Sequence, residues 1–154
     1  MFRIGRHMLK ILKYIIRYYF FISTLTVAPT AFAAELHVSV DGVRSQSGQL
    51  RIALFKSADT FATPDGRFRE VVLPAEKGAN TAIFLSVPMG TYGLAAFHDE
   101  NGNGKFDKNF VGFPQEGFGF GNNASVFLGP PSFSEASVSI EDKPNSHSVT
   151  LRYW

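Results

Sequence analysis

The sequence predicts an all-β fold, a single seven-stranded β-sandwich with one long loop rich in glycine and phenylalanine. Three observations lead to this prediction. Short runs of alternating apolar and polar residues recur along the chain, glycine and proline turns separate them, and no stretch keeps a helical period. The chain contains no cysteine. Disulfides, thiolate metal sites and cysteine nucleophiles are therefore excluded, and stability must come from the apolar core.

The first 33 residues have the three parts of a cleavable signal peptide. An apolar run covers residues 18–28, Pro29 breaks it, and Ala31 and Ala33 are small residues at the −3 and −1 positions. The preceding region contains no acid and five basic residues, namely Arg3, Arg6, Lys10, Lys13 and Arg17. Met8 is an alternative start, after which Lys10 and Lys13 would still serve as the basic region. We therefore expect cleavage after Ala33 and a domain at 34–154 that is periplasmic or secreted.

The alternative to cleavage is a retained membrane anchor. A spanning helix needs about 20 apolar residues, and Arg17 and Pro29 leave fewer than that between them. We expect no membrane span after signal cleavage.

Removing residues 1–33 also takes away five of the 15 basic residues and none of the 13 acids, which leaves 10 basic residues against 13 acids and a formal charge of −3. Without a basic cluster, the domain is not expected to bind nucleic acid.

The first predicted strands follow closely on the signal peptide. Residues 36–40 alternate, with Leu36, Val38 and Val40 on one face, and residues 49–56 do the same with Leu50, Ile52 and Leu54. Asp41-Gly42 and Gln46-Ser47-Gly48 are typical turn sequences. Residues 67–73 are expected to add another strand.

Four further strands complete the predicted sandwich. In residues 81–87, one face is expected to carry Ile83, Leu85 and Val87. In residues 91–98, one face is expected to carry Tyr92, Leu94 and Ala96. Pro88-Met89-Gly90 is expected to join them as a tight hairpin. The last two strands alternate around Lys143-Pro144-Asn145, through Ala136, Val138 and Ile140 and then Val149, Leu151 and Tyr153.

Residues 99–132 show no clear strand. Loops of this length are uncommon unless they are functional or disordered. Six of the 12 phenylalanines that follow the signal peptide lie here, whereas disordered segments are poor in aromatic residues. We expect an ordered loop with its own small apolar cluster.

Residues 99–107 have the pattern D-x-N-x-N-G-x-x-D, which predicts a Ca²⁺ site. A hard cation needs several converging oxygens, and Gly104 stands where a calcium loop turns sharply. The expected ligands are Asp99, Asn101, Asn103, Lys105 through its carbonyl, Asp107 through water, and Glu116 as a sixth.

The pattern differs from an EF-hand at its twelfth position, where Phe110 replaces a bidentate glutamate. A strand is also expected before the loop instead of a helix. With few carboxylates, the affinity should be weak, on the order of 10⁻⁴–10⁻³ M. The alternative is that Asn101-Gly102 and Asn103-Gly104 are simply turns.

Residues 117–123 alternate glycine and phenylalanine. Phe118 and Phe120 could stack on a sugar or a peptide, but the favoured interpretation is that they pack against the end of the sandwich while the glycines allow the backbone angles. The order of the glycines does not match a dinucleotide-binding loop.

Three histidines, His37, His98 and His147, lie on separate predicted strands with no metal-binding spacing. His98-Asp99 resembles part of a catalytic triad, but no G-x-S-x-G motif is present. No catalytic residue and no catalytic cofactor are therefore expected.

Several segments together resemble a known family. They are residues 88–99, Asn101-Gly102-Asn103-Gly104, Asp107, residues 112–120 and Asn122-Asn123. The chain is similar over residues 36–153 to the exported bacterial proteins grouped as domain-of-unknown-function family 2141. This resemblance implies a bacterial envelope or secreted location and a transthyretin-like (prealbumin-like) or Cna-B-like sandwich, related in form to immunoglobulin domains. It implies no activity and no ligand residues.

The expected function is that of an exported, non-enzymatic β-sandwich, stabilised by Ca²⁺, whose long-loop end binds an unidentified protein or glycan of the cell envelope. One alternative is a carbohydrate-binding module that uses the Phe118/Phe120 loop. A hydrolase centred on His98 is the other.

Overall fold

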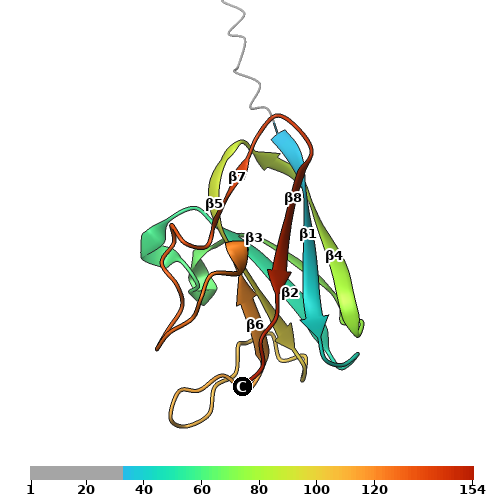
Figure 1. Cartoon of the computed structure of the whole chain (residues 1–154), viewed down its shortest axis with the longest axis vertical. Helices are drawn as coiled ribbons and strands as arrows, with labels where there is room; N and C mark the ends of the chain where they lie inside the picture. The colour runs from blue at the N-terminus through green and yellow to red at the C-terminus, as the bar shows by residue number, and fades with distance from the viewer. Residues whose placement is uncertain (1–32) are drawn as a thin grey trace, which may run out of the picture. The chain divides into compact units, whose positions relative to one another are not determined.

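The computed structural model describes residues 33–154. Apart from Ala33, the predicted signal peptide lies outside the described residues. The described part is all-β (Figure 1), and no helix in it is long and apolar enough to cross a membrane. Its eight strands are β1 (Ala33–Val43), β2 (Gln49–Phe55), β3 (Arg67–Pro74), β4 (Gly78–Pro88), β5 (Gly90–Asp99), β6 (Gly117–Phe120), β7 (Ser137–Ile140) and β8 (Asn145–Thr150). Three 3₁₀ turns occupy Ala58–Thr60, Pro64–Gly66 and Gly121–Asn123.

The strands form two sheets that pack as a sandwich. The smaller sheet has the order β4-β1-β8, and the larger has the order β3-β2-β5-β6. Strand β1 runs antiparallel to β4 and parallel to β8. Strand β7 shares an edge of β5 with β6, because β7 pairs with Gly90–Gly93 and β6 pairs with Ala95–His98.

The core lies between the sheets and uses the faces that the alternation predicts for most strands. Every residue of this set is at most 5% exposed: Leu36, Val38, Val40, Leu50, Ile52, Leu54, Tyr92, Leu94, Ala96, Val138, Ile140, Val149 and Leu151. Burying a large apolar side chain stabilises the fold by about 1.5–3 kcal/mol. The core of a cysteine-free domain is therefore its main source of stability.

The sandwich has eight strands, one more than predicted. The additional strand is β6, which lies in the segment where no strand was expected and pairs with the end of β5. Glycine normally weakens a strand, so the Gly-Phe alternation resembles a loop in sequence. The last strand also begins earlier than predicted, at Asn145.

The expected hairpin at Pro88-Met89-Gly90 is wrong. Strands β4 and β5 belong to different sheets, and the link crosses between them. The predicted inner face of β4 is also wrong in part, since Ile83 and Leu85 are 45% and 62% exposed while Phe84 is buried. A bulge near Ser86, whose φ is 55°, returns Val87 to the core. Because β4 is apolar on both faces, alternation could not select between them.

A second apolar cluster covers the outer face of the larger sheet and is called the outer cluster below. Phe106 packs edge-on against Phe97 and Phe118, with ring centroids 5.6 Å apart in both pairs. Its buried members are Ala53, Phe55, Phe61, Phe118, Phe120 and Ala136, and its partly buried members are Ala95, Phe97, Phe106, Ala124, Val126 and Phe133. The long segment after β5 therefore packs against the sheet, and Phe106, Phe118 and Phe120 join this shared cluster where a separate cluster of the loop was expected.

Candidate functional site

Asp99 closes the loop that follows β5. Its side chain is fully buried. Oδ2 accepts hydrogen bonds from Nε2 of Gln49 (2.9 Å), Nε of Arg51 (3.2 Å) and the backbone N–H of Gly104 (2.8 Å). Oδ1 accepts one from the backbone N–H of Asn103 (3.0 Å). Gly104 has a φ of +77°, which glycine adopts without strain. Asp99 thus fixes the sharp turn and ties it to β2.

The hydrogen bonds to Asp99 hold it ionised. Burial by itself would raise the pKa of this carboxyl, but the bonds from Gln49, Gly104, Arg51 and Asn103 outweigh burial and lower the pKa. The sequence did not reveal Gln49 and Arg51 as partners. Their polar character on the outer face of a predicted strand was the only signal, and the pairing of β2 with β5 could not be read from it.

Three predicted ligands converge at the mouth of the loop. Nδ2 of Asn101 and Nδ2 of Asn103 both donate to Oδ2 of Asp107, each over 2.7 Å. The amide oxygens of Asn101 and Asn103 accept from the backbone N–H groups of Asn103 (2.9 Å) and Lys105 (2.7 Å). An amide oxygen has two lone pairs, so both can still accept a further partner. Lys105 enters this network through its backbone, and its side chain is exposed.

Glu116 supports the loop from the other side. It is 4% exposed, and its two oxygens accept from the backbone N–H groups of Glu100 (3.2 Å) and Asp107 (3.0 Å). Burial raises the pKa of Glu116, and the negative charges of Asp107 and Asp99 raise it further, against the opposing effect of the two hydrogen bonds. The structure therefore brings the carboxylates of Asp107 and Asp99 close enough to that of Glu116 to repel it.

Within residues 33–154, no three His, Cys, Asp or Glu side chains form a metal-binding group by themselves. A cation in this loop would have to use the amide oxygens of Asn101 and Asn103 together with Asp107. Such a mixture of carboxylate and amide oxygens is one that Ca²⁺ accepts. The hydrogen bonds also close the loop without an ion, so the Ca²⁺ site stays a prediction.

His98 has a structural environment. It is fully buried, with Nε2 lying 2.7 Å from the carbonyl oxygen of Ser47 and Nδ1 lying 2.8 Å from the hydroxyl of Tyr153. A carbonyl oxygen only accepts, so Nε2 carries a proton. Both ring nitrogens are therefore hydrogen-bonded, and Ser47 contacts the ring through its backbone carbonyl and not through its hydroxyl. The described contacts give the hydrolase alternative no nucleophile.

The two phenylalanines of the Gly-Phe segment are buried, but they pack in the outer cluster on the larger sheet and not on the end of the sandwich. Phe118 and Phe120 are 5% and 9% exposed, which leaves neither ring accessible to a sugar. The glycines are needed for close approach, because a Cβ on Gly117 would lie 2.2 Å from the ring of Tyr153 and one on Gly119 would lie 2.6 Å from the carbonyl oxygen of Thr150. The alternation therefore allows the end of the chain to lie directly against β6.

A tight turn follows the loop at residues 99–107, which is called the cation loop below. Asn109 and Phe113 are joined by a backbone hydrogen bond of 2.8 Å, and Oδ1 of Asn109 accepts from the N–H groups of Val111 and Phe113, each over 3.0 Å. At its apex Phe110 is 99% exposed and Val111 is 59% exposed. Phe113 lies beside Trp154, with ring centroids 6.0 Å apart. The loop thus carries a fixed, solvent-exposed apolar apex.

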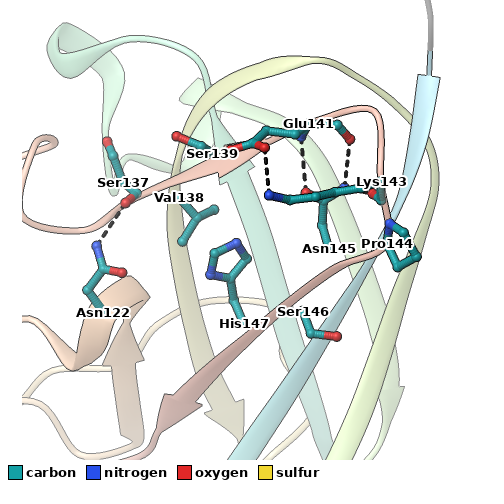
Figure 2. Close-up of a pocket in the computed structure, with 10 residues that line it drawn as sticks. All are labelled: Asn122, Ser137, Val138, Ser139, Glu141, Lys143, Pro144, Asn145, Ser146 and His147. Atoms are coloured by element: carbon teal, nitrogen blue, oxygen red, sulfur yellow. Dashed lines mark hydrogen bonds and ion pairs between the residues drawn. The ribbon is translucent and has the colours of Figure 1, made fainter.

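A polar pocket of about 380 Å³ opens where β7 and β8 face each other without pairing. Figure 2 shows Val138 and His147 pointing into it and Asn145 spanning the turn above. Nδ2 of Asn145 donates to the carbonyls of Glu141 (3.0 Å) and Lys143 (2.6 Å), and Nδ2 of Asn122 donates to that of Ser137 (2.8 Å). The two amide side chains are thus used to shape the rim.

The sequence matches the model of a family described as "Uncharacterized protein conserved in bacteria (DUF2141)" over residues 38–148. No curated protein and no solved structure matches the chain. The matched region includes the cation loop, the turn after it and all of β6. It covers more than half of the chain, and the protein therefore belongs to the DUF2141 family.

Proposed function

We propose that this is an exported, non-enzymatic binding protein that holds Ca²⁺ in the loop at residues 99–107 and contacts the cell envelope through the end of the molecule that carries this loop. The observation behind the proposal is the convergence of Asn101 and Asn103 on Asp107 directly before the exposed Phe110 turn. The loop pattern that predicts a hard cation therefore lies at the base of an accessible apolar surface.

Local charge favours a cation. Arg51 contacts both Asp99 (3.2 Å) and Glu70 (2.9 Å), and Arg67 also pairs with Glu70 (3.4 Å), so Arg51 is the basic partner of Asp99. Asp107 and Glu116 add two further acidic groups beside Asp99. A divalent ion would offset this excess of negative charge, which water and amide groups only partly do. It would also hold the loop, and with it the following turn, in one conformation.

Asp107 is the best position at which to test the ion. Asp99 is unsuitable because it is fully buried and its removal would open the loop with or without Ca²⁺. Asp107 lies at the mouth, where its carboxylate meets both asparagine amides. We would titrate the exported, processed protein with millimolar Ca²⁺ by calorimetry and follow its melting temperature, comparing Asp107→Ala with the exposed control Asp142→Ala.

We expect binding heat and a rise in melting temperature for the native protein and for Asp142→Ala, and neither for Asp107→Ala. Ligand linkage predicts that the rise grows with the Ca²⁺ concentration above the dissociation constant. An absence of heat and of any thermal shift in the native protein would remove the Ca²⁺ part of the proposal.

The carbohydrate alternative loses its binding surface, because the rings of Phe118 and Phe120 are buried.

A further inference from the structure

We infer that the protein docks on a lipid bilayer, inserting two apolar turns among phosphate-bearing headgroups. The turns are Phe110-Val111, called the first tip, and Phe127-Leu128, called the second tip. The inference rests on the proposed function, since it names the envelope component that the long-loop end contacts. It does not require the Ca²⁺ ion, because Asn109 holds the first tip by its own hydrogen bonds.

Both tips expose large apolar side chains almost completely. Phe110 is 99% exposed, Phe127 86% and Leu128 93%. Single exposed apolar residues are common on protein surfaces, whereas grouped ones mark an interaction site. Here they occur as neighbouring pairs at the apex of two separate turns. Neither pair contributes to the core, so folding alone does not account for them.

The tips leave the same face of the molecule. The first follows Phe106 and the second follows Val126, and both of these residues pack in the outer cluster on the larger sheet. Figure 1 shows the two excursions, in gold and in orange, projecting on the same side of the sandwich. Both tips therefore extend from segments that pack on the same face of the larger sheet.

Hydrogen bonds shape the first tip before any partner arrives. The N–H of Gly112 donates to the carbonyl of Asn109 over 2.9 Å, which adds to the side-chain bonds that fix the first tip. Leu128 has a φ of 54°, a conformation that is unfavourable for leucine. Such strain at an exposed apolar residue points to function rather than to packing. A turn that is already fixed loses little entropy when it binds.

The charge pattern selects a lipid surface. Residues 117–134 contain no charged side chain, and the only acid between Lys108 and Glu135 is Glu116, which is buried. Lys105 and Lys108 are exposed at the base of the first tip. Lipid phosphates attract such lysines, and exposed carboxylates would have been repelled. This region thus differs from the rest of a domain whose formal charge is −3.

The chemistry of the tips fits lipid better than a protein cleft. A stable protein interface buries about 1,200–2,000 Å² and has a polar rim with specific hydrogen bonds. Two small, separate tips without polar side chains offer neither. Binding to a bilayer requires only apolar side chains that insert and basic groups near them. Trp154 and Phe113 lie just behind the first tip, and aromatic rings favour the level of the headgroups.

Trp154 makes the inference directly measurable, because it is the only tryptophan of the chain and is 67% exposed. We would add vesicles of phosphatidylcholine, with or without phosphatidylglycerol, to the exported, processed protein. Flotation would measure binding, and the tryptophan emission would report insertion. Each measurement would be made with Ca²⁺ and with a chelator.

The variants are Phe110→Ser with Val111→Ser, Phe127→Ser with Leu128→Ser, and Lys108→Glu alone. The matched control is Ile83→Ser with Leu85→Ser, which changes exposed apolar residues of β4 in the other sheet. Melting curves would verify that each variant is folded. Lys108→Glu leaves both turns intact and keeps the test valid if a serine variant fails to fold.

We expect flotation with the mixed vesicles and a blue shift of the Trp154 emission. Either tip variant should weaken binding roughly tenfold or more, since each removes two inserted apolar side chains. Lys108→Glu should weaken binding to the mixed vesicles, and the β4 control should bind as the native protein does.

No flotation with either vesicle, or equal binding by native protein and tip variants, would overturn the inference. Self-association that the tip substitutions abolish, without lipid binding, would overturn it in favour of a second copy of the chain. Vesicle binding that persists in the chelator, together with no calorimetric signal for Ca²⁺, would support the lipid inference and refute the Ca²⁺ part of the proposed function. Calorimetric Ca²⁺ binding without flotation would do the reverse.

Discussion

Nε of Arg51 lies 3.2 Å from Oδ2 of Asp99, and this ion pair joins the middle of β2 to the loop that follows β5. The same oxygen also accepts from Gln49 and Gly104. A single buried carboxylate therefore connects two strands and the turn of the candidate cation loop. Its removal should affect both stability and the shape of the loop.

Asp99→Asn should destabilise the fold by about 1–3 kcal/mol, because an amide cannot accept all the bonds and leaves buried donors without partners. Urea unfolding would measure the change, with the exposed Asp142→Asn as its control. Asp99 has a pKa below its ordinary value of 3.8. Its contribution is therefore present above that value and is lost as the pH falls through the pKa of the folded state. Equal acid sensitivity in native protein and Asp99→Asn would contradict this assignment.

The stability contributed by Glu116 should change with pH in the direction opposite to that of Asp99. Its pKa is raised above the ordinary value of 4.5, so the fold favours the protonated form. The stability that protonation gives is complete below that value and is lost as the pH rises through the pKa of the folded state. Thermal melting across this range should show a decline that Glu116→Gln lacks. If the native protein and this variant show the same pH dependence, burial and the neighbouring carboxylates do not raise the pKa of Glu116 as described.

Gly119→Ala should destabilise the protein, since a Cβ there would lie 2.6 Å from both the carbonyl oxygen of Thr150 and Cγ1 of Val149. Overpacking of this kind costs about 1–3 kcal/mol. Denaturant unfolding would measure it, and Ser125→Ala, at an exposed position of the next loop, is the control. A melting temperature equal to that of the native protein would mean that β6 and β8 are not in such close contact.

Cleavage after Ala33 predicts that the exported protein begins at Ala34. Intact mass measurement of the protein recovered outside the cytoplasm would test this. Ala33→Asp should keep the signal attached, while Ala33→Ser should still be cut, because the peptidase requires a small residue there. Cleavage would remove only the first pair of the β1–β4 ladder, Ala33 opposite Pro88. Recovery of a chain that still carries residues 1–33 would contradict the prediction.

Regular alternation made most of the fold predictable. Leu50, Ile52 and Leu54 could be assigned to one face because the polar residues Gln49 and Arg51 begin the alternation. Strand β6 could not be found in this way, since its glycines serve the close approach of Tyr153 and Thr150, which come from the far end of the chain. The prediction that Ile83 and Leu85 face the core was wrong for a different reason. Both faces of β4 are apolar, and a bulge changes the register.

The candidate site was predictable where its members are consecutive in sequence. The spacing of Asp99, Asn101, Asn103 and Asp107 identified the loop, since one turn brings these residues together. Gln49 and Arg51 reach it only through the antiparallel register of β2 and β5, and no local pattern encodes that register. The second tip gave no sequence signal, because Phe127-Leu128 resembles a short piece of core until its exposure is known.

The position of β1 has a consequence for biogenesis. This first strand is the middle strand of its sheet and is bonded along residues 36–41 to the final strand, from Leu36 opposite Asn145 to Asp41 opposite Thr150. The smaller sheet therefore cannot be completed until residues 145–150 have been synthesised, and pairing over so large a sequence separation is slow. For the export that we propose, this delay is an advantage, because a chain that threads through a narrow translocation channel must still be unfolded.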